Sequence, residues 1–187
     1  MTLLRVTASA LAAVLLSGCA VTIGPSATPT PVPDQPERSG QPERSGQPAA
    51  EHTWTYELVD SATRPADATS ARLKGTSDTF AHSTSLWVGC DGAADEVVLA
   101  TGGRFRQLFG RLGLRDNAPA GLVVHTLVSV DGQPVQNVQL DSDDPSAVEL
   151  NVVLTGVQRV TFRSEAVEGA CSTSDDSYAV LGDGFVE

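Results

Sequence analysis

Short runs of alternating or β-branched apolar residues, separated by polar turn residues, make up most of residues 51–187. Such runs are typical of β-strands, in which successive side chains point to opposite faces. The pattern predicts strands at residues 53–59, 96–99, 122–130, 135–140, 148–152, 157–163 and 178–186. We find no amphipathic helix of three turns in the pattern. Short strands spaced about ten residues apart indicate an all-β sandwich or barrel.

One turn is predicted directly. Asp131-Gly132 separates two β-branched runs, 122–130 and 135–140. The favoured two-residue hairpin turn needs positive φ at both central residues, and Asp-Gly is among the pairs that suit it best. We therefore expect a β-hairpin there.

The first 18 residues have a different pattern. Arg5 is the only charge before an apolar stretch at residues 6–16, and small residues follow. This layout is that of a secretory signal peptide, and the stretch is shorter than the roughly 20 residues of a membrane-spanning helix. Cys19 directly after Leu16-Ser17-Gly18 resembles the bacterial lipobox, in which the cysteine is acylated and becomes the first residue. We expect a membrane-anchored lipoprotein on the extracytoplasmic face; the alternative is an ordinary signal peptide with a chance cysteine.

Residues 19–50 are predicted to be a spacer. They are rich in Pro, Ser, Thr and Gln, and residues 35–40 repeat directly as residues 41–46. Such a segment lacks the apolar surface needed to offset its chain entropy. The predicted organisation is a signal peptide at 1–18, a linker at 19–50 and one folded domain at 51–187.

The net charge and the cysteines limit the possible binding partners and the redox state of the compartment. A formal net charge of −11 argues against nucleic acid and anionic lipid surfaces as partners. With Cys19 acylated, Cys90 and Cys171 form an even pair in an oxidising compartment, which favours a disulfide. Two free thiols or a metal site are the alternatives, although no histidine lies near either cysteine in the sequence.

A series of motifs across the folded region carries a family resemblance. Residues 72–80 lead to the apolar run 97–100, then to Gly113-Leu114-Arg115-Asp116 and the Asp131-Gly132 hairpin; residues 152–162 and 179–185 complete the order. This order resembles the NPCBM family, the novel putative carbohydrate-binding module. The resemblance implies a galactose-binding-like jelly roll of two antiparallel sheets, and a binding module rather than an enzyme.

Candidate sugar-binding residues follow from the chemistry of sugar recognition. Sugars bind through aromatic faces and through polar side chains that reach hydroxyl groups. Trp87, Tyr178, Arg111 and Asp116 are the candidates. Structural alternatives exist for each: Trp87 packing beside the disulfide, Tyr178 in the core, and Arg111 with Asp116 fixing a loop. We expect four other aromatic residues in the core: Phe80, Phe105, Phe109 and Phe162.

Catalytic and metal chemistry have little support in the sequence. The three histidines are scattered, and neither Gly-x-Ser-x-Gly nor His-Glu-x-x-His occurs. The acidic run 141–144 lacks the spacing of a calcium loop, so we expect a solvated turn. We expect no catalytic residues, no metal and no cofactor. The predicted partner is carbohydrate, such as cell-wall glycan; the alternative is another envelope protein bound by an interaction or sensor module.

Overall fold

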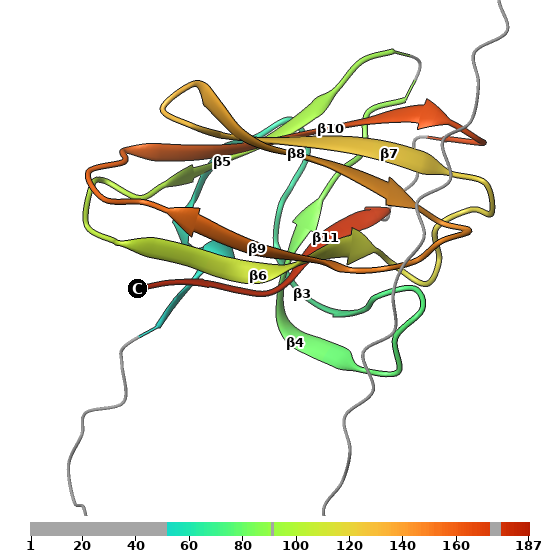
Figure 1. Ribbon diagram of the computed structural model, residues 1–187, viewed down its shortest axis with the longest axis horizontal. Coiled ribbons are helices and arrows are strands. Elements are labelled where there is room, and N and C mark those ends of the chain that lie inside the picture. Colours follow the sequence, from blue (N-terminus) through green and yellow to red (C-terminus); the bar gives the residue numbers. More distant parts are fainter. Residues whose placement is uncertain (1–51, 91, 173–176) are drawn as a thin grey trace, which may run out of the picture. The chain divides into compact units, whose positions relative to one another are not determined.

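The computed structural model describes residues 52–90, 92–172 and 177–187 (Figure 1). The predicted signal peptide at 1–18, the lipidation site Cys19 and the linker at 19–50 lie outside these residues. Within the described part, no helix has the length and apolar character needed to cross a membrane.

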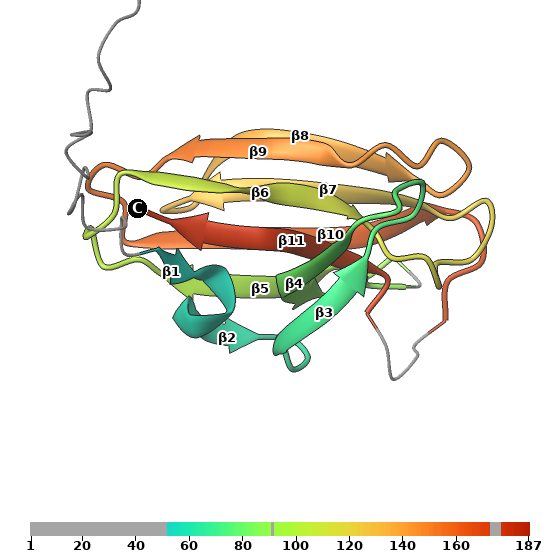
Figure 2. The ribbon, with the colours of Figure 1, turned by 90° about the horizontal axis from the view of Figure 1, so that it is seen from below.

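Two antiparallel sheets face each other, as the two layers of Figure 1 show. Figure 2 looks onto sheet A, whose strands lie side by side from β9 to β3. Sheet A has the order β3-β4-β11-β6-β9, with β1 also pairing with β11, and sheet B has the order β2-β5-β10-β7-β8. The elements are β1 (Thr53–Trp54), a 3-10 helix (Thr55–Leu58), β2 (Val59–Ala62), β3 (Ala68–Arg72), β4 (Thr79–Leu86), β5 (Asp95–Ala100), β6 (Gln107–Leu114), β7 (Val123–Val130), β8 (Gln133–Asp141), β9 (Val148–Val153), β10 (Arg159–Glu168) and β11 (Ala179–Val186). The predicted all-β class is confirmed.

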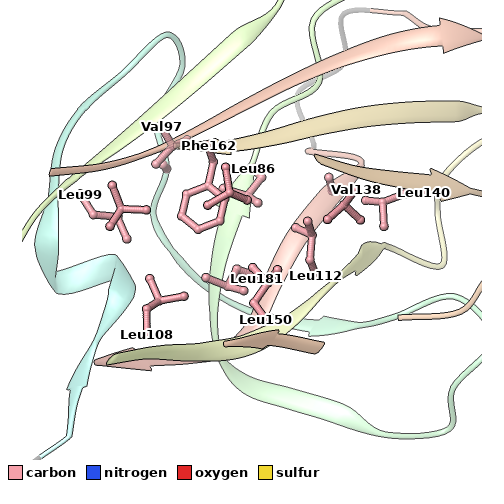
Figure 3. Packing of buried hydrophobic residues seen from close by; sticks show 14 of the residues in the cluster. Leu86, Val97, Leu99, Leu108, Leu112, Val138, Leu140, Leu150, Phe162 and Leu181 are labelled. Carbon is pink, nitrogen blue, oxygen red and sulfur yellow. The ribbon is translucent and has the colours of Figure 1, made fainter. Parts of the chain in front are cut away.

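The core lies between the two sheets. Inward side chains of β5 and β10 face those of β6, β9 and β11, which Figure 3 shows from close by. Phe162 is among the largest of these side chains and is 1% exposed. Full burial of such a side chain contributes roughly 1.5–3 kcal/mol relative to leaving it in water.

The predicted hairpin is confirmed. Asp131 and Gly132 join β7 to β8 with φ values of 47° and 80°. The Asp131 carboxylate also accepts hydrogen bonds from the backbone N–H groups of Gln158 (3.0 Å) and Arg159 (2.9 Å). The aspartate therefore both shapes the turn and attaches it to the start of β10.

The single strand predicted at residues 53–59 is wrong. A 3-10 helix separates β1 from β2, and these two strands belong to different sheets. The buried Thr55 hydroxyl lies 2.6 Å from that of Thr84 and donates to the Gly184 carbonyl (3.2 Å). These bonds hold the crossover against sheet A, so local alternation of side chains does not require a continuous strand.

The predicted disulfide joins Cys90 to Cys171, with 5.6 Å between their Cα atoms. It links the β4–β5 connection to the β10–β11 connection. Beside it, the Gly89 N–H donates to the Ser164 carbonyl (3.0 Å) and the Gly89 carbonyl accepts from the Ala166 N–H (2.8 Å). The segment before Cys90 is therefore held by backbone bonds as well as by the bridge.

Candidate functional site

The structure brings three of the four predicted site residues to one end of sheet A. Ala179 pairs with both Leu86 and Leu114, so the residues that adjoin these three positions lie close together. Those adjoining residues are Trp87, Tyr178 and Arg115, and Asp116 follows Arg115. Arg111 is not part of this group, because it lies within β6 opposite Gly182.

The Trp87 ring at this end already contacts other residues of the protein. The Arg64 guanidinium lies 4.3 Å from the centre of the Trp87 ring, and the indole N–H donates to the Pro65 carbonyl. Arg64 also forms an ion pair with Asp95. One face of the half-buried Trp87 ring is therefore covered by a side chain that is itself anchored.

Tyr178 and Asp116 make mainly structural contacts. Tyr178 is 8% exposed and its hydroxyl lies 3.1 Å from that of Ser172. The Asp116 N–H donates to the Arg72 carbonyl (3.2 Å), while its side chain is exposed. This end of the sandwich thus leaves the Asp116 side chain exposed, with Tyr178 largely withdrawn from the surface.

Arg111 instead lines a groove on the outer face of sheet A, the face away from the core. We call it the outer groove. Its volume is about 510 Å³, within the range typical of small-molecule sites. It is lined by residues of β4, β6, β9 and β11: Phe80, Phe109, Gly110, Arg111, Glu149, Leu150, Asn151, Gly182, Asp183 and Phe185.

Strand register places an aromatic row beside a polar row in the outer groove. Phe109 lies opposite Phe185 on one side and Asn151 on the other. The two phenyl rings stack with their centres 5.3 Å apart. In the neighbouring row, Arg111 lies opposite Gly182 and Glu149.

Gly182 keeps the outer groove hollow. A Cβ atom at this position would lie 2.9 Å from Cγ of Phe80, closer than real side chains pack. A bulge follows Gly182 in β11, with Asp183 at a φ of 42°. One carboxylate oxygen of Asp183 accepts from the backbone N–H of His82 (3.0 Å), which fixes the side chain at the rim.

The polar groups of the outer groove are open to water. Nη2 of Arg111 lies 3.4 Å from Oε1 of Glu149, and these side chains are 46% and 79% exposed. Asn151 and Asp183 are exposed as well. Two carboxylates and one guanidinium give the groove a net negative charge.

The aromatic row continues beyond the outer groove. Trp54 of β1 lies opposite Phe185, with the two rings edge to face at 6.3 Å. The Trp54 ring stacks on His82 at 4.1 Å, and the Tyr56 hydroxyl lies 3.3 Å from Nδ1 of that histidine. Rings from β1, β4, β6 and β11 therefore gather on one face of the sandwich.

The prediction that Phe109 belongs to the core is wrong, because its ring faces the outer groove. Phe80 and Phe162 are buried as predicted, and Phe105 packs against the edge of the core. One signal was available in the sequence. Phe109 is two positions from the charged Arg111 and next to the apolar Leu108. Because side chains alternate along a strand, Phe109 shares the outer face with Arg111.

The acidic run 141–144 forms a turn with internal hydrogen bonds. Asp143 accepts from the Gly121 N–H (3.0 Å), and Asp141 accepts from the Asp143 N–H (2.8 Å). Across residues 52–90, 92–172 and 177–187, no three His, Cys, Asp or Glu side chains are grouped to hold a metal ion.

No family model and no curated protein matches this chain. Solved structures from Clostridium perfringens do match. The CBM51 of GH95 in complex with methyl-galactose has a TM-score of 0.54 and 16% identity, over 73% of this chain and 99% of that one. CBM51-2 with the INT domains of ZmpB, in complex with GlcNAc, has a TM-score of 0.52 and 17% identity, over 73% of this chain and 31% of that one. The M60 catalytic domain of ZmpB with CBM51-1 and CBM51-2 has a TM-score of 0.55 and 14% identity, over 72% of this chain and 15% of that one.

These likenesses concern the fold. The chain spans less than a third of the two ZmpB structures and nearly all of the GH95 module. The predicted galactose-binding-like jelly roll, a β-sandwich of two antiparallel sheets, is confirmed.

Proposed function

We propose that this domain binds carbohydrate without covalent chemistry, and that the outer groove is the binding site. The observation that carries the proposal is the groove itself. Phenyl rings line it and four exposed planar polar side chains surround it: Arg111, Glu149, Asn151 and Asp183. Fold alone does not decide function, and these side chains supply the chemistry that sugar binding needs.

The groove supplies both kinds of contact that a sugar needs. The C–H face of a pyranose ring packs on aromatic surface, which Phe109 and Phe185 provide. Its hydroxyl groups need donors and acceptors. Arg111 donates, Glu149 and Asp183 accept, and the Asn151 amide does both. Because Asp183 is already fixed by the His82 N–H, little side-chain entropy is lost when it accepts a hydroxyl.

The charge of the groove favours a neutral sugar. Glu149 and Asp183 outnumber Arg111, and the whole chain carries a net charge of −11. A uronic acid or a phosphorylated sugar would be repelled by both. A neutral hexose or an N-acetylhexosamine has no such cost. The CBM51 structures in complex with methyl-galactose and with GlcNAc support a sugar of this class.

The proposed setting comes from the N-terminal sequence. Acylation of Cys19 would attach the domain to the cell membrane on its extracytoplasmic face, with residues 19–50 as spacer. Cell-wall glycan is the proposed partner there. A single shallow groove binds weakly, and many anchored copies facing one polymer would raise the avidity.

A glycan array followed by calorimetry on the best neutral glycan tests the proposed function. Phe109→Ala should weaken binding at least tenfold, which is about 1.4 kcal/mol. Leu127→Ala truncates a half-buried apolar side chain on the outer face of sheet B and is the matched control. Unchanged affinity in Phe109→Ala, or a loss in Trp87→Ala instead, would refute the outer groove as the site.

The same assays distinguish carbohydrate binding from the alternative, an interaction or sensor module. Absence of binding to any glycan, together with specific capture of an envelope protein, would favour the interaction-module interpretation.

The anchoring proposal has its own test: Cys19→Ala should release the protein from membranes, and mass spectrometry of the mature wild-type protein should show acyl chains. Firm membrane attachment of Cys19→Ala would refute it.

A further inference from the structure

β9 is the least protected sheet edge among the described strands. Among the edge strands that the structure describes, β1 has two residues, β2 has a bulge, β3 pairs with β4 through a register shift, and β8 has both a bulge and Pro134. Such features block pairing with other chains. β9 has neither a bulge nor a proline: its six residues pair with β6 without a register shift, and Glu149 is its one charged residue.

The free backbone groups of β9 can be assigned from one hydrogen bond. The Leu154 N–H donates to the Arg106 carbonyl (2.7 Å), so residue 154 points its backbone groups toward β6. Along a strand, successive residues point their backbone N–H and C=O groups to opposite sides. The N–H and C=O groups of Glu149, Asn151 and Val153 therefore point away from the sheet. The side chain of Val153, also on the outer face, is 66% exposed.

We propose that β9 pairs antiparallel with β9 of a second copy of this chain, with Asn151 on the two-fold axis. This register sets Asn151 opposite its own copy and Glu149 opposite Val153. Each of the three resulting pairs exchanges two main-chain hydrogen bonds. A register with Glu149 opposite Glu149 would instead place like charges together, at a cost in stability. The surface is thus self-complementary, as a two-fold interface requires.

The pairing should be weak and should strengthen with salt. One strand pair buries less surface than the roughly 1,200 Å² at the lower end of stable interfaces. Each chain also carries a net charge of −11, and screening by salt reduces the repulsion between two copies. Two outer faces of sheet A would then form one continuous surface. The two outer grooves would flank the joint, because Glu149 and Asn151 line each groove.

Cysteine crosslinking tests the register. In a Cys19→Ser background, Asn151→Cys places two thiols opposite each other in a hydrogen-bonded pair. The expected Cα separation of about 5.5 Å lies within the range of disulfides. Mild oxidation should give a crosslinked dimer much faster than Val135→Cys, an exposed position on β8. Equal rates in the two variants would overturn the proposed register.

Sedimentation equilibrium of the full chain tests the pairing itself. Val153→Pro removes an N–H that β6 does not use and should weaken self-association at least tenfold. Circular dichroism should show an unchanged sheet. Val167→Ala, at an exposed position on β10, is the control and should associate like the wild type. A wild-type chain that stays monomeric into the high micromolar range at high salt would overturn the proposal, whether or not sugar binding is found.

Discussion

Removal of the Cys90–Cys171 disulfide, by Cys90→Ala with Cys171→Ala, should destabilise the domain through its unfolded state. The two cysteines are 81 positions apart. In the loop-entropy model a closed loop of this length restricts the unfolded chain by roughly 15 cal/mol/K, which is about 4.5 kcal/mol at 25 °C. We take this figure as an upper limit, because real denatured chains retain residual structure.

The folded state should change little in the double variant. The Gly89 N–H and carbonyl keep their bonds to Ser164 and Ala166, so the segment stays attached to β10. Trp87, three residues before Cys90, reports on the same region through its fluorescence. The native emission spectrum should therefore match that of the wild type.

Urea unfolding followed by tryptophan fluorescence measures the effect. The expected result is a loss of about 2–4.5 kcal/mol in the free energy of unfolding. The free energy of unfolding should also fall more steeply with urea concentration, because the unlinked denatured chain exposes more surface. Cys19→Ala leaves the bridge intact and is the control. A loss below about 1 kcal/mol, or a changed native spectrum, would refute the entropic account.

Two further sets of variants test backbone and hydrogen-bond interactions. Gly169 and Gly156 share positive φ values of 83° and 77°, but a Cβ at Gly169 would lie 2.1 Å from the Gly121 carbonyl oxygen whereas Gly156 faces open space. In thermal melts Gly156→Ala should cost about 1–2 kcal/mol and Gly169→Ala clearly more; equal costs would show that the close approach is absent. The buried hydroxyls of Thr126 and Ser164 lie 2.9 Å apart. Thr126→Val alone should cost about 1–3 kcal/mol in urea unfolding, and adding Ser164→Ala should recover part of that loss; a further loss would contradict the pairing.

The sequence predicts six of the strands well. β5, β7, β8, β9 and β11 begin and end within two residues of the predicted bounds, and β10 begins within two residues but ends five residues later. The hairpin at Asp131-Gly132 is equally clear, because its turn chemistry is local. Such features can be predicted because neighbouring residues alone determine them.

The elements that the apolar pattern missed depend on distant partners. β3, β4 and β6 were not predicted. β3 and β4 are rich in Ser, Thr and Ala, β6 contains two glycines, and all three become strands by pairing within sheet A. The crossover at Thr55 depends on a hydroxyl contact with Thr84, 29 positions away. No window of local sequence contains that information.

The outer groove was hidden from sequence reasoning for a related reason. Its walls come from β4, β6, β9 and β11, and only the strand register places Phe109 beside Phe185 and Asn151. Arg111 was a candidate from the sequence, but its predicted partner Asp116 lies in the loop after β6. Glu149 takes that place instead. Alternation along a strand predicts which residues face outward, and only the register between strands shows which of them meet.

The place of β11 in its sheet has a consequence for biosynthesis. β11 is the last strand of the sandwich to leave the ribosome, yet it lies between β4 and β6 in the middle of sheet A. Before residues 179–186 leave the ribosome, β4 can pair only with β3 and β6 only with β9, so the two halves of sheet A stay unjoined. Contacts so distant in sequence also form slowly. The chain should therefore remain unfolded until translation of the domain is nearly complete.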